Sequence, residues 1–108
     1  MLENNFIFTL TENQLIEKLI DDSNLQLNHM VLLKGGGLPE HYSNSNVYLL
    51  IIKGRMSLVL EEQEPHFYSA GQIVRIPYHT KMNIKNYEED RLEFFVVKAP
   101  SPKSFGGH

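Results

Sequence analysis

Two glycine-bounded stretches decide the fold of this chain: GGGLPEHYSNSNVYLLIIKG at residues 35–54 and GQIVRIPYHTKMNIKN at residues 71–86. Each contains a short apolar run typical of a β-strand, at residues 47–52 in the first stretch and 73–76 in the second. Glycine, proline and polar clusters bound these runs. The pattern therefore predicts short strands joined by turns.

The same pattern continues outward on both sides of these stretches. Strand-like segments are expected at residues 25–33, 56–60, 67–68, 81–86 and 92–97. Strands that recur roughly every eight to twelve residues predict an all-β barrel or sandwich. The strands should be antiparallel, because the connections leave no room for the helices of parallel crossovers.

The N-terminal region is predicted to contain one short helix, at residues 12–20. Thr11 and Gln14 have the spacing of a capping box, and apolar residues follow at helical intervals from Leu15 onward. We therefore expect an N-terminal strand and helix in residues 1–24, a barrel in residues 25–100 and a flexible tail in residues 101–108. Residues 106–108 should be its most mobile part.

The two central stretches resemble the paired signature motifs of the cupin superfamily. The first motif is glycine, five residues, His-x-His, three or four residues, glutamate, six residues and glycine; Gly35, His41, Ser43, Val47 and Gly54 occupy these positions. The second motif is glycine, five residues, Pro-x-Gly, two residues, histidine, three residues and asparagine; Gly71, Pro77, His79, Met82 and Asn86 stand at these positions, with His79 in place of the glycine and Met82 in place of the histidine. The resemblance covers about half of the chain. It implies a jelly-roll barrel, also called a double-stranded β-helix.

The metal-binding positions of the motifs are mostly replaced in this chain. In the family, two histidines, a glutamate and a third histidine hold a divalent metal inside the barrel. His41, Ser43, Val47 and Met82 stand at these positions, and only His41 is an ordinary ligand for such an ion. We therefore expect no cofactor. If a divalent metal is bound, His41 and His29 are the candidate ligands.

A ligand pocket inside the barrel is expected instead. Strand periodicity and the aligned motifs predict that it is lined by His41, Ser43, Val47, Leu49, Ile51 and Met82. His29 alternates with leucine and valine and is expected to point inward as well. It is either a core histidine with a hydrogen-bond partner or a pocket-lining residue.

Three functions fit these features. The first is binding of a small molecule in the barrel without the usual metal. The second is a metal-dependent enzyme, of dioxygenase or isomerase type, with a site rebuilt around His41 and His29. In the third, a metal-free enzyme uses His41 as a general base. The sequence does not decide whether the protein is an enzyme.

Composition restricts the other partners. The chain has 108 residues, a net charge of −3 and no cysteine, and its basic residues are scattered. No nucleic-acid partner is therefore expected, since that would require a basic surface. No apolar stretch is long enough to span a bilayer, and no basic-then-apolar leader is visible, so neither membrane insertion nor export is expected. We expect a cytoplasmic protein.

Two strands are apolar on both faces, at residues 48–52 and 94–97. A strand of a free-standing antiparallel barrel needs only its inner face to be apolar. The outer face, including Leu50 and Ile52, should therefore be covered. We expect a homodimer to cover it. The alternative is cover by the N-terminal helix together with residues 6–8 of the same chain.

Overall fold

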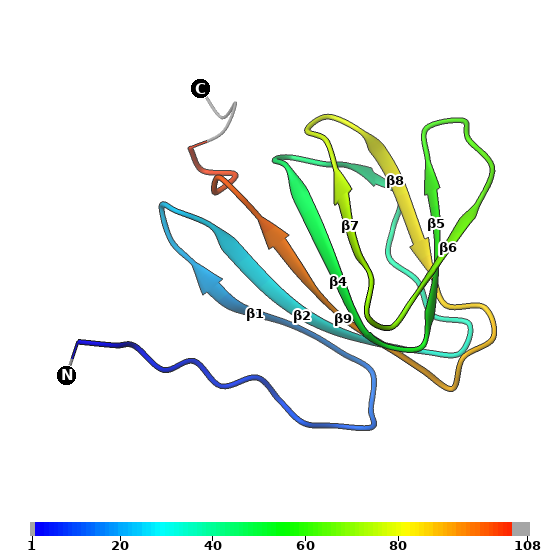
Figure 1. The fold of residues 1–108 in the computed structure, drawn as a ribbon, viewed down its shortest axis with the longest axis horizontal. Coiled ribbons are helices and arrows are strands. Elements are labelled where there is room, and N and C mark those ends of the chain that lie inside the picture. The colour runs from blue at the N-terminus through cyan, green and yellow to red at the C-terminus, as the bar shows by residue number, and fades with distance from the viewer. Residues whose placement is uncertain (1, 105–108) are drawn as a thin grey trace.

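The computed structural model describes residues 2–104, which form nine strands and no helix. The strands are β1 (Leu15–Asp21), β2 (Gln26–Leu33), β3 (His41–Tyr42), β4 (Val47–Lys53), β5 (Arg55–Leu60), β6 (His66–Ser69), β7 (Ile73–Ile76), β8 (Lys81–Lys85) and β9 (Arg91–Lys98). They form a five-stranded sheet, ordered β1-β2-β9-β4-β7, and a four-stranded sheet, ordered β3-β8-β5-β6 (Figure 1). All strand pairs are antiparallel, so the all-β prediction is confirmed.

The apolar core fills the space between the two sheets. It takes alternate residues of the strands, such as Leu49 and Ile51 from β4 and Met56 and Leu58 from β5, all almost fully buried. The sharp turn from β4 to β5 depends on Gly54, whose φ is +86°. A Cβ atom there would lie 2.6 Å from the carbonyl oxygen of Arg91, so only glycine fits.

The helix predicted at residues 12–20 is wrong, because this segment contains strand β1. Leu15 pairs with Val31 and Glu17 with His29 along the edge of strand β2. Thr11 does not cap a helix; its hydroxyl accepts a hydrogen bond from the N–H of Asn13 at 3.0 Å in a local turn. The apolar residues fitted a helical period because a register shift between Lys18 and Ile20 interrupts the alternation of the strand.

Both faces of strand β2 are buried. The face that we predicted to point into the barrel points to the outer side of the sheet instead. Asn28 and Met30 face the space between the sheets, whereas His29 and Val31 face the outer side. The outer side is covered by the extended N-terminal segment, in which Phe8 meets the rings of His29 and Phe95 edge-on, each at 5.1 Å. The N-terminal cover that we considered as an alternative to a dimer thus exists in part, as an extended segment instead of a helix.

The predicted flexible tail begins with an anchored segment. Ser101 is fully buried, and its N–H donates to the carbonyl of Asn24 at 3.1 Å. The Ser104 hydroxyl donates to the carbonyl of Ser23 at 3.4 Å. Residues 105–108, which complete the predicted tail, lie outside the described residues. In the part of the chain that is described, no helix is long and apolar enough to cross a membrane.

Candidate functional site

A cavity of about 50 Å³ lies between the sheets at the end of the barrel where strands β3 and β8 meet. Five of the seven predicted pocket residues line it, and they are His41, Ser43, Val47, Leu49 and Met82. His41 and Met82 are direct register partners across β3 and β8, as the spacing of the two motifs predicts. Ile51 lies in the neighbouring core and does not reach the cavity.

His41 is exposed and forms part of the rim of this cavity. Its Nδ1 atom lies 2.8 Å from the carbonyl oxygen of Pro39. A carbonyl can only accept a hydrogen bond, so Nδ1 carries a proton. In the neutral ring the lone pair is then on Nε2, which makes no hydrogen bond within the described residues and is available to a ligand.

Ser43 has a structural role in this arrangement. Its hydroxyl donates to the carbonyl of Pro77 at 2.6 Å and accepts from the N–H of Thr80 at 2.8 Å. These bonds fix the turn between β7 and β8. They also leave the hydroxyl little capacity for a ligand, although Ser43 lines the cavity.

The donor set at the four family positions does not fit a divalent metal. Val47 has no donor atom, the Ser43 hydroxyl is engaged by the backbone, and the Met82 thioether is a soft ligand. Only His41 remains, whereas a site of this kind needs about three protein ligands. In residues 2–104 no group of three or more histidine, aspartate or glutamate side chains is arranged to hold a metal ion.

Two polar residues that the sequence analysis did not select also line the cavity, Asn28 and Lys98. The Oδ1 atom of Asn28 is buried and has no hydrogen-bond partner within residues 2–104, and the whole residue is only 8% exposed. Lys98 is partly buried and makes no ion pair within the described residues. Burial lowers the pKa of Lys98 below its ordinary 10.5, and repulsion from Lys18 lowers it further. Among the described residues, the Asn28 oxygen therefore has no hydrogen-bond donor and the Lys98 ammonium group has no counter-ion.

The size of the cavity limits what it can hold. One water molecule needs roughly 10–15 Å³ of cavity volume, so a cavity of 50 Å³ accommodates about three to five non-hydrogen atoms. This is far below the few hundred Å³ of pockets for drug-sized ligands. The apolar side chains of the core, including Met30 and Ile84, fill the rest of the barrel.

His29 lies on the other side of the five-stranded sheet, so the expectation that it points into the barrel with His41 is wrong. It is fully buried, and its Nδ1 and Nε2 atoms lie 2.8 and 2.7 Å from carboxylate oxygens of Glu17 and Glu93. A neutral imidazole can donate from only one nitrogen. The two short contacts therefore require one further proton, which the ring and the two carboxyl groups share.

This histidine cluster extends into the N-terminal segment. The Glu17 carboxylate accepts hydrogen bonds from the N–H and the hydroxyl of Thr9 at 2.8 and 2.9 Å. The bond from the Thr9 N–H and then the bond with His29 hold the pKa of Glu17 below 4.5, against the opposing effect of burial. Arg91 lies 3.7 Å from Glu93 and donates to the carbonyl of Thr11 at 2.6 Å. The cluster thus fastens the N-terminal segment to the sheet.

The comparisons with known proteins agree with the motif resemblance. No family model matches the chain. Uncharacterized protein MJ0764 of Methanocaldococcus jannaschii is 54% identical over 92 residues, which are 85% of this chain and 79% of that protein. The crystal structure of MJ0764, described as an RmlC-like cupin family protein with a double-stranded β-helix fold, matches with a TM-score of 0.93 and 51% identity over 95% of both chains.

The chain belongs to the RmlC-like cupin family. Cupins from Desulfitobacterium hafniense and Salinispora arenicola are more distant, with TM-scores of 0.72 and 0.73 at 15% and 17% identity. The first match covers 86% of this chain and 83% of the other, and the second covers 89% and 83%. At this level of identity the likeness concerns the fold alone.

Two motif positions outside the metal-binding set, Asn86 and His79, hold turns of the backbone, which explains why the motif spacing is retained. The fully buried Asn86 donates from Nδ2 to the carbonyls of Leu32 and Glu89, both at 2.9 Å, and accepts from the N–H of Glu89. His79 stands where the family has glycine and adopts a φ of +63°. It therefore keeps the left-handed turn that the glycine would supply. Its ring stacks on Tyr42 at 5.2 Å.

Proposed function

We propose that this cupin binds a small anion in its barrel without using a bound metal. The observation that carries the proposal is the partly buried Lys98, which lines the cavity and has no ion pair in the described chain. Removing a charge from water without a partner is unfavourable, and an anionic ligand would supply that partner. The lowered pKa of Lys98 agrees with a partly buried ammonium group that has no counter-ion among the described residues.

The other polar groups suggest what else the ligand carries. The buried oxygen of Asn28 needs a hydrogen-bond donor. The free nitrogen of His41 can accept a second hydrogen bond at the rim. A short carboxylate that also carries a hydroxyl would pair with Lys98 and donate its one hydroxyl proton to the Asn28 oxygen or to the His41 nitrogen. Glycolate falls within the size limit set by the cavity and has this chemistry, so it is the probe that we choose.

The test is a titration followed by the backbone amide signals of the protein in nuclear magnetic resonance, with a chelator present. Glycolate should shift the signals of Asn28, His41 and Lys98 in a saturable way, with an affinity of about millimolar, as expected for so small a ligand. Acetate lacks the hydroxyl and should bind several-fold more weakly. K98M should abolish binding, whereas the matched variant K53M, at an exposed lysine, should retain it. Equal binding by K98M would refute the proposal.

A second candidate is a metal-free enzyme that uses His41 as a general base. It is favoured by the contact of Nδ1 with the Pro39 carbonyl, which leaves Nε2 as the basic atom of the neutral ring. Turnover of a bound hydroxy acid that is lost in H41Q, with binding retained, would establish this function. If the hydroxy acid binds but is not converted, the enzyme hypothesis is wrong and the protein acts as a binding module.

The metal-dependent alternative requires ligands other than the pair that we first considered, because His29 and His41 lie on different sides of the five-stranded sheet. Elemental analysis after washing with a chelator tests it directly. We expect no stoichiometric transition metal, since a single histidine leaves most of the coordination shell to water. One metal ion per chain after this washing would overturn the metal-free proposal.

A further inference from the structure

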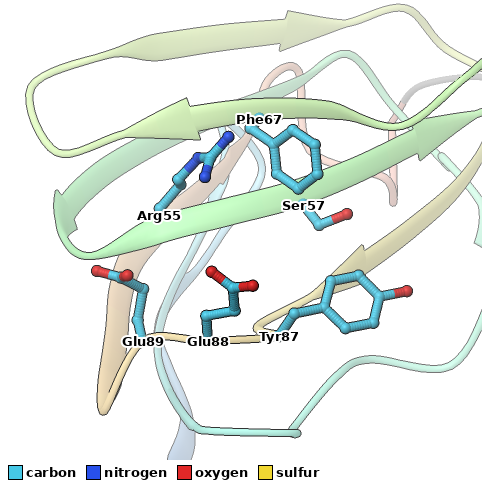
Figure 2. Close-up of a pocket in the computed structure, with 6 residues that line it drawn as sticks. All are labelled: Arg55, Ser57, Phe67, Tyr87, Glu88 and Glu89. Atoms are coloured by element: carbon cyan, nitrogen blue, oxygen red, sulfur yellow. The ribbon is translucent and has the colours of Figure 1, made fainter.

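A second pocket, separate from the barrel cavity, lies on the outer face of the four-stranded sheet. It has a volume of about 160 Å³ and is lined by Arg55, Ser57, Phe67, Tyr87, Glu88 and Glu89. The first two residues come from strand β5, Phe67 comes from β6, and the other three come from the loop between β8 and β9. Figure 2 shows Phe67 above Ser57, with Tyr87 and the glutamates on the loop below.

The charged groups of this pocket are not paired with one another. The Arg55 guanidinium lies over the ring of Phe67, 4.2 Å from its centroid, and forms no ion pair in the described chain. The side chains of Glu88 and Glu89 likewise form no ion pair or hydrogen bond within residues 2–104. Within the described part of the chain, the Arg55 cation and the carboxylates of Glu88 and Glu89 are therefore without an ion-pair partner and can meet a ligand.

The floor of the pocket is the hydroxyl of Ser57. This residue is only 3% exposed, and its hydroxyl makes no hydrogen bond within the described residues, but the oxygen is not among the fully buried side-chain atoms that lack a partner. The hydroxyl therefore keeps contact with the pocket, where it can donate or accept a hydrogen bond. Its position among the pocket-lining residues lets it contact a ligand that also meets the charged groups.

The walls are aromatic. Phe67 and Tyr87 are large rings that remain 47% and 56% exposed. One face of Phe67 carries Arg55, and the ring of Tyr87 has Lys85 6.0 Å from its centroid. Lys85 thus lies beside the pocket, so two cations, Arg55 and Lys85, accompany the two carboxylates of Glu88 and Glu89. A ligand with a single charge would therefore meet repulsion from one set of groups.

We infer that this outer pocket binds a small zwitterion, an α-amino acid with an aromatic or long apolar side chain. Its ammonium group would pair with Glu88 and Glu89, and its carboxylate would accept hydrogen bonds from the edge of the Arg55 guanidinium. Its apolar side chain would pack between Phe67 and Tyr87. Ser57 would bond to either polar group at the floor.

The volume of the pocket fits such a ligand. At roughly 10–15 Å³ for each water-sized group, 160 Å³ holds on the order of ten to fifteen non-hydrogen atoms. L-phenylalanine is of this size and is the probe that we choose. 2-Phenylethylamine lacks only its carboxylate, and 3-phenylpropanoate lacks only its ammonium group, so the two compounds test each charge separately.

The experiment measures the binding of these three compounds to the full chain by amide signals. L-phenylalanine should shift the signals of Arg55, Phe67 and residues 87–89, and each analogue should bind about tenfold more weakly, the value of one charge-assisted contact. R55Q should weaken binding of phenylalanine about tenfold and leave binding of 2-phenylethylamine unchanged or stronger. The double variant E88Q/E89Q should selectively weaken the two amines.

E64Q, an exposed glutamate in the turn between β5 and β6, is the matched control and should bind as the unchanged protein does. Equal binding of all three compounds, or an R55Q variant that binds phenylalanine normally, would overturn the inference. So would the absence of saturable shifts up to the solubility limit of phenylalanine. Because glycolate reports on the signals of Asn28, His41 and Lys98, the barrel proposal and this one can fail separately.

Discussion

The stability of the fold should depend strongly on His29, although this residue lies outside the barrel cavity. Replacing it by leucine keeps a side chain of similar size but removes the group that both carboxylates contact at 2.8 and 2.7 Å. Glu17 and Glu93 would then face each other across a buried apolar side chain. The contacts of the ring with Phe8 and Phe95 would be lost as well.

The expected cost follows from the burial of the three groups. Removing one partner of a buried charged pair costs about 3–5 kcal/mol. The carboxylate side chains remain 20% and 12% exposed, so water compensates in part, and we expect a value near the lower end, about 3 kcal/mol. This is a large fraction of the roughly 5–15 kcal/mol by which domains of this size are stable.

Urea unfolding followed by circular dichroism measures this cost. With a slope of about 2 kcal/mol per molar urea, H29L should unfold at a midpoint roughly 1.5 M lower. Adding E17Q and E93Q should recover about half of the loss, because neutral amides do not repel. H66L, at an exposed histidine of strand β6, should stay within about 0.5 kcal/mol. A loss below 1 kcal/mol for H29L would refute a stabilising role for the two contacts of the ring with Glu17 and Glu93.

Three further predictions concern acid stability, the β4–β5 turn and assembly. The contribution of Glu17 to stability should be complete above pH 4.5 and disappear as the pH falls through its lower folded-state pKa; unfolding of E17Q as a function of pH should lack this component. G54A should lower the free energy of unfolding by about 3 kcal/mol or more, because its new methyl group would clash with the backbone of Arg91. G71A also has a positive φ (+93°), but open space surrounds it, so the loss should be about 1 kcal/mol. Comparable unfolding midpoints of the two variants would contradict this prediction. We also propose that a second copy covers the exposed Ile52 and Ile73 on the outer face of β4 and β7, so light scattering should give twice 12.5 kDa, and a monomer mass would refute the dimer.

Motif spacing predicted the parts of the structure that depend on fixed connections along the chain. The distance between the two glycine-bounded motifs placed His41 and Met82 beside each other, and the structure pairs them in register. Gly54 and Asn86 determine turns through backbone geometry and backbone hydrogen bonds. Such requirements are local, so they are visible in the sequence.

Sequence periodicity failed where both faces of a strand are buried. In strand β2 the more apolar alternate set, which includes His29, was assigned to the barrel, yet it lies under the N-terminal segment. The true inner set contains Asn28, a polar residue that the pattern alone would place in solvent. Lys98 could have been found, because it continues the inner alternation of Phe94 and Val96.

The second pocket could not be predicted from the sequence. Its residues come from β5, β6 and a loop that are separated along the chain, and no motif links them. Antiparallel pairing brings Ser57 opposite Phe67. The fold of the loop around Asn86 then places Glu88 and Glu89 beside them.

The most direct test of anion binding in the barrel is the pKa of Lys98, measured by nuclear magnetic resonance of its side chain with and without glycolate. In the free protein, burial and Lys18 should hold this pKa below 10.5. An anion beside the ammonium group stabilises its charged form, so saturating glycolate should raise the pKa. A Lys98 pKa that does not change when glycolate is bound would show that the anion does not lie beside Lys98, and would contradict the proposed function.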